Sequence, residues 1–198
     1  MITVGRIVPE TPAGVLSGLA SGELSRARVV CETGPELTSP AQAVFDPSRT
    51  FRYLLTRTWD DQRPPAVWVM LNPSTADAFT DDPTIRRCAR FAACRGAGGI
   101  TVVNLFAYRA ADPAALRSVA DPVGEFNDEF IRHAAQPGGR LVVAAWGVHG
   151  TLLGRAAAVT RMLTAAGVAL HCLGTTSQGH PRHPLYVAAN TPLASYQP

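Results

Sequence analysis

The chain has 198 residues, of which 46% are hydrophobic and 17% charged, and its formal net charge at pH 7 is +3. This composition is that of an ordinary globular protein, and the charge permits a nucleic-acid partner without arguing for one. No apolar run reaches the roughly 18 residues of a membrane span, and no basic segment followed by an apolar core marks a secretory signal. We therefore expect a cytoplasmic protein that does not contact a membrane.

The cysteines and histidines offer little to a metal ion. Four cysteines are scattered along the chain without a C-x-x-C pair: Cys31, Cys88, Cys94 and Cys172. Closed metal sites need clustered ligands and cytosolic disulfides are rare, so we expect free, buried thiols and no metal or other cofactor. A zinc site built from His171, His180 and His183 is conceivable, but this spacing matches no usual zinc pattern.

The first 62 residues read as a β-rich extension. A short apolar run at 29–31 can form a strand, and two more runs follow at 43–45 and 51–59. Between the last two lies Asp46-Pro47-Ser48-Arg49, whose residues favour a turn. Because 51–59 alternates between apolar and polar residues, it predicts a half-exposed strand. Residues 1–62 are thus predicted to carry an antiparallel hairpin that packs on the main domain.

Residues 63–198 alternate between apolar runs and segments of helical spacing. The runs that predict buried strands are 67–71, 100–106, 141–146 and 168–173. Asp82 before Pro83 predicts the start of the first helix, and apolar faces at 126–134 and 152–166 predict two more. Connections of helix length give parallel strands with helices on both faces. The fold class is therefore α/β, a three-layer α/β/α sandwich with a four-stranded parallel sheet.

Polar residues follow three of these runs, at the places where an open α/β sheet binds its ligands. Asn72 follows the first run, Asn104 ends the second, and the loop 179–186 follows the last. If the sheet is parallel, these groups lie on one edge and face one pocket. Each Asn taken singly is explained by a local turn. Two Asn and a His on one edge also suit a ligand with donors and acceptors, such as a nucleobase.

Charged groups near these positions have more than one reading. His183, between two prolines, is a structural or solvated side chain, or a donor to a developing anion. Among the loop carboxylates, Asp82 caps the helix and Asp77 and Asp81 are solvated charges. Alternatively, one of the three positions a water molecule. The arginines of the first helix form a solvated face or a phosphate-tracking patch: Arg86, Arg87, Arg90 and Arg95. No P-loop, dinucleotide fingerprint or nucleophile elbow occurs, which argues against those enzyme classes.

Four motifs resemble a bacterial and phage family that is known only as a domain of unknown function. They are Met70-Leu71-Asn72-Pro73-Ser74-Thr75-Ala76-Asp77, Val103-Asn104-Leu105-Phe106-Ala107-Tyr108-Arg109, Ala145-Trp146-Gly147 and Pro181-Arg182-His183-Pro184-Leu185-Tyr186. The resemblance covers about residues 50–195. It implies membership of a family but no activity.

The order of these motifs also resembles the uracil-DNA glycosylase superfamily. That resemblance implies a parallel α/β/α fold, a base-reading Asn at Asn104 and a His loop at His183. The chain departs from the superfamily at three motif positions, the first being Met70, which replaces the Gly of the first motif. Asn72 stands where the most active members have a general-base Asp, and Leu185 replaces a small polar residue of the His loop. Asn72 cannot accept a proton, so its carbonyl oxygen would only orient water.

We therefore predict a glycosylase-like enzyme that hydrolyses the N-glycosidic bond of a nucleobase in DNA or in a nucleotide. The predicted catalytic residues are Asn72, Asp77 and His183. The predicted substrate-binding residues are Pro73, Ser74, Thr75, Asn104, Phe106, Arg109, Arg182 and Tyr186. One alternative is a non-catalytic nucleotide- or modified-base-binding protein on the same fold. Another is a metal-dependent nucleotide-processing enzyme that uses Asp77, Asp81 and Asp82. The oligomeric state has no signal in the sequence.

Overall fold

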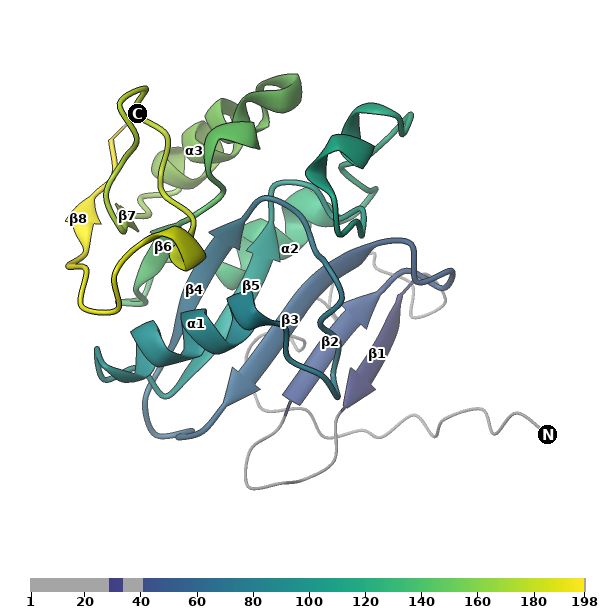
Figure 1. Cartoon of the computed structure of the whole chain (residues 1–198). Coiled ribbons are helices and arrows are strands. Elements are labelled where there is room, and N and C mark those ends of the chain that lie inside the picture. Colours follow the sequence, from purple (N-terminus) through teal and green to yellow (C-terminus); the bar gives the residue numbers. More distant parts are fainter. Residues whose placement is uncertain (1–28, 34–40, 198) are drawn as a thin grey trace.

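In the computed structural model, which describes residues 29–33 and 41–197, eight strands form one open sheet (Figure 1). The strands are β1 (Val30–Thr33), β2 (Ala41–Phe45), β3 (Arg52–Thr58), β4 (Pro65–Met70), β5 (Gly99–Asn104), β6 (Val142–Ala144), β7 (Leu170–Cys172) and β8 (Ala194–Ser195). Their order across the sheet is β1-β2-β3-β5-β4-β6-β7-β8. The described strands therefore begin at one edge of the sheet and reach its centre with β4.

The sheet is mixed, with a parallel centre and antiparallel margins. The four strands predicted from apolar runs are parallel neighbours, in the order β5-β4-β6-β7. Four of the seven strand pairings are nevertheless antiparallel, so the prediction of a four-stranded parallel sheet was too narrow. The reason lies at β5, whose outer edge would expose unpaired backbone groups. β3 pairs with that edge in antiparallel register, from Leu55 opposite Val102 to Thr58 opposite Gly99.

The predicted hairpin is confirmed, and it is part of the same sheet. β2 and β3 pair antiparallel, and the Asp46 carboxylate accepts the backbone N–H groups of Ser48 and Phe51 at 3.0 and 2.7 Å in the turn. The expectation that β3 is half-exposed was wrong for 52–55, which is buried throughout. Both faces of the strand are covered, because Tyr53 and Leu54 pack in one apolar cluster and Leu55 in the other. Residues 1–28 and 34–40 of the predicted extension lie outside the described residues.

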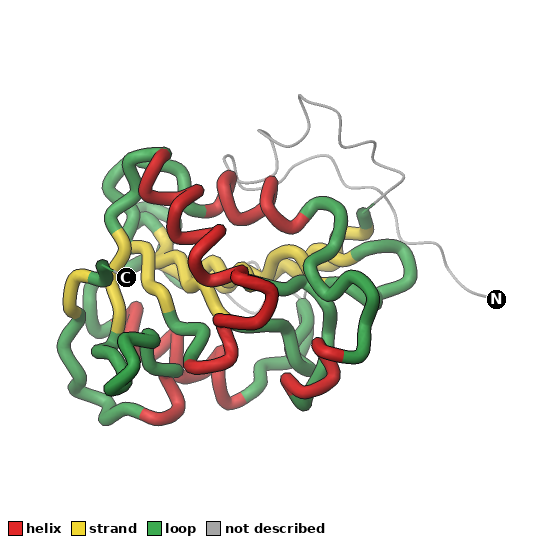
Figure 2. Tube along the Cα trace, turned by 90° about the horizontal axis from the view of Figure 1, so that it is seen from above, coloured by secondary structure: helices red, strands yellow, loops and turns green. Residues whose placement is uncertain are grey.

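Three α-helices in the described part cover both faces of the sheet (Figure 2): α1 (Pro83–Ala93), α2 (Asn127–Ala134) and α3 (Arg155–Ala165). The predicted start of α1 is confirmed, because the Asp82 carboxylate accepts the N–H of Ile85 at 2.9 Å and Pro83 opens the helix. None of the described helices has the length and apolar character that a membrane crossing requires.

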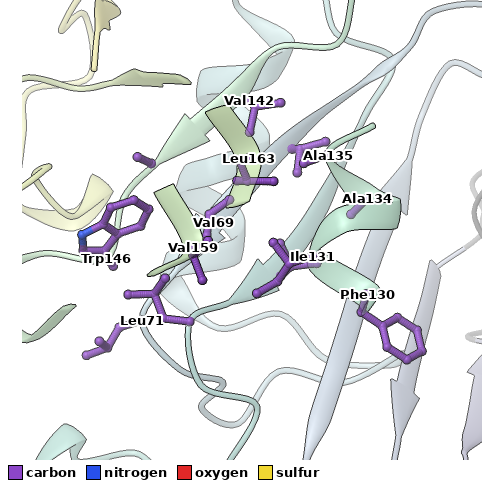
Figure 3. Close-up of a cluster of buried hydrophobic side chains, with 14 of the residues drawn as sticks. Val69, Leu71, Phe130, Ile131, Ala134, Ala135, Val142, Trp146, Val159 and Leu163 are labelled. Carbon is purple, nitrogen blue, oxygen red and sulfur yellow. The ribbon is translucent and has the colours of Figure 1, made fainter. Parts of the chain in front are cut away.

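Two apolar clusters lie on opposite faces of the sheet. On one face, α1 packs through Ile85, Cys88 and Phe91 on alternate residues of β4 and β5. On the other face, α2 and α3 pack over the intervening residues (Figure 3). In that cluster Trp146 and Leu71 lie at one end and Phe130 at the other. The end with Trp146 and Leu71 borders the pocket described below.

Of the four cysteines, Cys88 and Cys172 are buried, as predicted, whereas Cys31 and Cys94 are exposed. Cys31 is on β1, which is an edge strand of the described sheet, and Cys94 follows the last turn of α1. All four thiols are free. No disulfide therefore contributes to the stability of the described fold.

Candidate functional site

A pocket of about 810 Å³ opens at the carboxyl ends of the parallel strands. This volume suits a small organic ligand. Its walls include the apolar side chains of Met70, Leu71 and Trp146. The charged and hydrogen-bonding side chains that line it are Arg52, Asn72, Ser74, Asp82, Thr84, Asn104, His149, Thr176, Ser177, Arg182, His183 and Tyr186. The loops after β4, β6 and β7 all contribute, as does the hairpin strand β3.

The structure brings six of the predicted site residues together in this pocket: Asn72, Ser74, Asn104, Arg182, His183 and Tyr186. Five others do not line it: Pro73, Thr75, Asp77, Phe106 and Arg109. The six come from segments after β4, after β7 and at the end of β5. Their chemical roles stay predictions, but their meeting in one cavity follows from the parallel pairing of the central strands.

The predicted residues outside the pocket stabilise its surroundings. Phe106 is fully buried in the core. The Asp77 carboxylate accepts the N–H groups of Phe79 and Thr80, each at 2.8 Å, and so caps a loop. The guanidinium of Arg109 lies 5.0 Å from the centroid of the Phe45 ring. Nothing in their sequence patterns distinguishes these supporting residues from the lining ones.

Asn72 is anchored through its amide nitrogen. Nδ2 donates to the carbonyl oxygens of Pro73, at 3.0 Å, and Ala110, at 2.8 Å. Both N–H groups of the amide are therefore committed to the backbone. The carbonyl oxygen of the side chain is the group left for a ligand or a water, and it is an acceptor with no basicity.

Asn104 contacts a buried arginine that the sequence did not single out. Both side chains are 2% exposed. Arg52 Nη1 donates to the carbonyl oxygen of Ala76 at 2.7 Å, and Nη2 donates to Asn104 Oδ1 at 3.5 Å. Burial lowers the pKa of Arg52 to about 10, against the opposing effect of nearby Asp82. The guanidinium is therefore still charged at neutral pH.

The end of β5, which carries Asn104, is hydrogen-bonded by side chains of α2 and α3. Asn127 Nδ2 donates to the carbonyl oxygens of Asn104, at 2.9 Å, and Leu105, at 3.0 Å. Arg155 Nε donates to the same Leu105 oxygen at 3.0 Å, and its Nη2 pairs with Asp128 at 2.6 Å. These buried contacts from α2 and α3 fix the position of Asn104.

His183 begins the short 3-10 helix η4 (Pro184–Tyr186) and is oriented by it. Nδ1 accepts the N–H of Leu185 at 3.3 Å, so the neutral ring carries its proton on Nε2. Burial lowers the pKa of His183 below its usual 6.5, although Asp82 opposes the shift. At neutral pH the ring is thus an uncharged hydrogen-bond donor in a pocket.

Arg87 of α1 and Arg95, just beyond the end of that helix, hold η4 and the loop that follows it. Arg87 Nη2 donates to the carbonyl oxygen of Val187 at 2.6 Å, and Nε donates to that of Pro184 at 3.3 Å. Arg95 Nη2 donates to the carbonyl oxygen of Thr191 at 2.6 Å. Arg87 and Arg95 are therefore neither a solvated face nor a phosphate-tracking patch.

A metal site built from Asp or His residues is the alternative that the sequence left open. Within 29–33 and 41–197, no three His, Cys, Asp or Glu side chains gather into a group that would hold an ion. His171 is on β7, whereas His183 lines the pocket.

A family model described as "Protein of unknown function (DUF1643)" matches residues 52–185. The chain belongs to this family. The DUF1643 match begins at Arg52 and contains every pocket-lining residue except Tyr186. The predicted membership of an uncharacterised family is thus confirmed, whereas the resemblance to the uracil-DNA glycosylase superfamily stays a prediction. No curated protein and no solved structure matches this DUF1643 chain.

Proposed function

We propose that the protein is a glycosylase-like enzyme that takes a nucleobase, from DNA or from a nucleotide, into the pocket and hydrolyses its N-glycosidic bond. One observation carries the proposal. Asn72, Asn104 and His183 come from three separate segments and line the same pocket at the carboxyl ends of parallel strands. In finer detail, we propose that the four central strands and their helices correspond to a uracil-DNA-glycosylase-like sandwich, which the order of the motifs supports.

The pocket has the shape and surface that a nucleobase requires. Its volume of about 810 Å³ exceeds that of a base, and Leu71 and Trp146 supply flat apolar contact. Tyr186 at the lining is 82% exposed, which leaves its ring open for stacking near the mouth. Asn104 supplies amide N–H groups for an acceptor on the base. A base that enters from a strand would be flipped out of its stack.

The pocket residues suit a cleavage in which opposite charges develop on the base and on the sugar as they separate. As the C1′–N bond breaks, its electron pair goes to the base and the sugar becomes an oxocarbenium ion. His183 Nε2–H stabilises the departing base by a hydrogen bond, and Asn72 Oδ1 orients the water that adds to C1′. The proton lost by that water ends on the departed base. We assign electrostatic stabilisation of the sugar to Asp82, because it lines the pocket and Asp77 does not.

A second candidate is a protein that binds a nucleotide or modified base without cutting it. The amide of Asn72 favours this candidate, because an amide oxygen cannot remove a proton from water. The two candidates share the pocket and the ligand class. They differ only in whether base is released.

The test is a base-release screen. Oligonucleotides carrying uracil, hypoxanthine, mismatched thymine or modified pyrimidines, together with free nucleosides and nucleotides, are incubated with the protein. Abasic sites and free base are the readout. We expect release that falls at least about 100-fold in His183→Ala, as for the loss of one hydrogen-bond donor to a developing anion. His180→Ala, in the same loop but outside the lining, should retain it. Saturable binding without release would establish the second candidate, and unchanged release in His183→Ala and Asn72→Ala would refute the assigned roles.

A further inference from the structure

Arg52 has surroundings unlike those of the other buried arginine in the described part. Arg155, 9% exposed, pairs with Asp128 through two nitrogens. Arg52, 2% exposed, has no Asp or Glu carboxylate oxygen within 4.0 Å of its nitrogens among the described residues. Its Nε is buried and has no hydrogen-bond partner there. A buried charge is costly unless it is paired. No carboxylate of the described residues therefore contacts Arg52, and its charge is favoured only from a distance, by Asp82 and Asp77.

Asp82 is the carboxylate that most favours the charge on Arg52, but it does not contact the guanidinium. Asp82 lines the same pocket, but its Oδ1 caps α1 at the N–H of Ile85. The two hydrogen bonds of Arg52 go to neutral acceptors, the Ala76 carbonyl and the Asn104 side chain. A guanidinium has five N–H groups, so these bonds leave donor capacity. Because Arg52 lines the pocket, a ligand in the pocket can accept hydrogen bonds from its remaining N–H groups.

Arg52 also changes what Asn104 can offer. Asn104 Oδ1 accepts from Arg52 Nη2, which turns the Nδ2 group toward other partners. The pocket lining thus includes N–H donors from both side chains. A neutral uracil edge alternates acceptors with a donor, and the N–H groups of Arg52 and Asn104 pair only with its acceptors. An edge that carries only acceptors fits, and a negative charge on it fits better, because charge-assisted hydrogen bonds are about twice as strong as neutral ones.

We propose that Arg52 and Asn104 form an anion-binding floor, and that the ligand is a nucleobase bearing a carboxylate on the edge that enters the pocket first. The inference deepens the proposed function and rests on it, because a base-binding pocket is what brings the edge of a base to this floor. Arg52 then receives from the ligand a directly contacting anion, which the described residues do not supply. The carboxylate accepts from the guanidinium and from Asn104 Nδ2.

Matched ligand pairs test the proposal without requiring catalysis. 5-Carboxyuracil and thymine differ by a carboxylate in place of a methyl group, and 5-carboxy-2′-deoxyuridine and thymidine form the same pair as nucleosides. Binding is measured by titration calorimetry with the full chain, and inorganic phosphate serves as the probe for an anion from another source. Arg52→Gln removes the charge and keeps donors. Arg90→Gln is the control, since Arg90 is exposed and outside the lining.

We expect the carboxylated ligand to bind at least about tenfold more tightly than its methyl partner. The preference should vanish in Arg52→Gln and persist in Arg90→Gln. If Arg52→Gln does not fold, the wild-type preference still decides, because equal or weaker binding of the carboxylated ligand overturns the proposal. Arg52-dependent binding of phosphate with no gain from the carboxylate also overturns it.

The two proposals fail in distinguishable ways. Release of neutral bases by the wild-type protein, with no preference for a carboxylate, would leave the proposed function standing and remove the anion-binding floor. Arg52-dependent binding of 5-carboxyuracil, with no nucleoside or oligonucleotide cleaved, would support the floor and refute hydrolysis.

Discussion

His183 combines a fixed acceptor and a free donor in one ring. The N–H of Leu185 occupies Nδ1, which fixes the tautomer, and the pocket receives Nε2–H. Burial keeps this ring neutral at pH values where an ordinary His would be partly protonated. A neutral N–H donor stabilises a departing anion through a hydrogen bond while it keeps its own proton. The same feature makes the fold sensitive to acid.

We expect His183→Asn to reduce the acid sensitivity of folding. The pKa of His183 is lowered in the folded protein, so below the unfolded value of about 6.5 the unfolded chain binds more protons. The wild-type free energy of unfolding should therefore fall as pH drops below about 6.5. Asn retains an acceptor for Leu185 N–H but does not titrate. Urea denaturation at pH 7.5 and 5 should show a smaller loss in the variant, and equal losses would contradict the assignment.

Single residues also show how much of the candidate site could be predicted from the sequence. Asn72, Asn104 and His183 were found because polar groups after apolar runs are conspicuous. Arg52 was missed because the alternation of 51–59 predicts an outward-facing side chain. Whether that position is exposed depends on the loop after β4 and the end of β5, which Arg52 contacts, and no local pattern encodes these distant partners. The roles of supporting residues such as Asn127 are likewise invisible, since their partners are distant backbone carbonyls.

At the scale of elements, the end of β5 depends on two helices behind it. Asn127 is fully buried and bridges two consecutive carbonyl groups beyond the strand. Asn127→Ala would leave two buried acceptors without this donor. We expect a loss of about 1–3 kcal/mol in the free energy of unfolding, measured by urea denaturation. The exposed Asn190→Ala should change it by less than about 0.5 kcal/mol. A loss in Asn127→Ala no larger than in this control would show that the bridge is dispensable.

The contact between α1 and the His183 loop gives a second prediction for an element. Arg87→Ala removes both hydrogen bonds to Pro184 and Val187, whereas Arg90→Ala removes an exposed side chain of the same helix. We expect Arg87→Ala to raise amide hydrogen exchange at Tyr186 and to weaken ligand binding, because the loop loses its attachment. Arg90→Ala should change neither. Identical exchange in both variants would mean that the arginine does not position the loop.

Helix signals were the most readable features of the chain. Asp82 and Pro83 mark the start of α1 by short-range chemistry that a sequence displays directly. The 3-10 segment η3 (Val148–Gly154) before α3 was less readable, because the apolar stripe from Leu152 onward continues through it. Leu153 there has a φ of 52°, a conformation that periodicity does not predict.

At the scale of the whole molecule, the hairpin and the parallel centre depend on each other. β3 contributes the buried side chains of Tyr53, Leu54 and Leu55 to the core, and it pairs with the edge of β5. Apolar runs predicted the strands, but their order could not be predicted, because pairing depends on edges that many strands could fill. The two-residue strand β8 had no apolar run to reveal it.

A fragment of residues 63–198 tests this dependence. Without β3, the fragment exposes the edge of β5 and the apolar surface that Tyr53, Leu54 and Leu55 cover, and it lacks Arg52. We expect it to associate or to melt without a cooperative transition. A fragment of residues 41–198 should melt cooperatively. Size-exclusion chromatography and thermal melting compare the two, and a monomeric, cooperative 63–198 fragment would show that the hairpin is a separable addition.

The central place of β4 has a consequence for biosynthesis. β4 precedes both of its sheet partners along the chain, and β6 is made only after α1, β5 and α2. On the ribosome, Val67, Trp68 and Val69 are therefore translated long before the surfaces that bury them. The nascent chain has to keep this segment from misassociating while synthesis continues. We expect chaperone availability to govern yield in cells more strongly than the stability of the finished fold does.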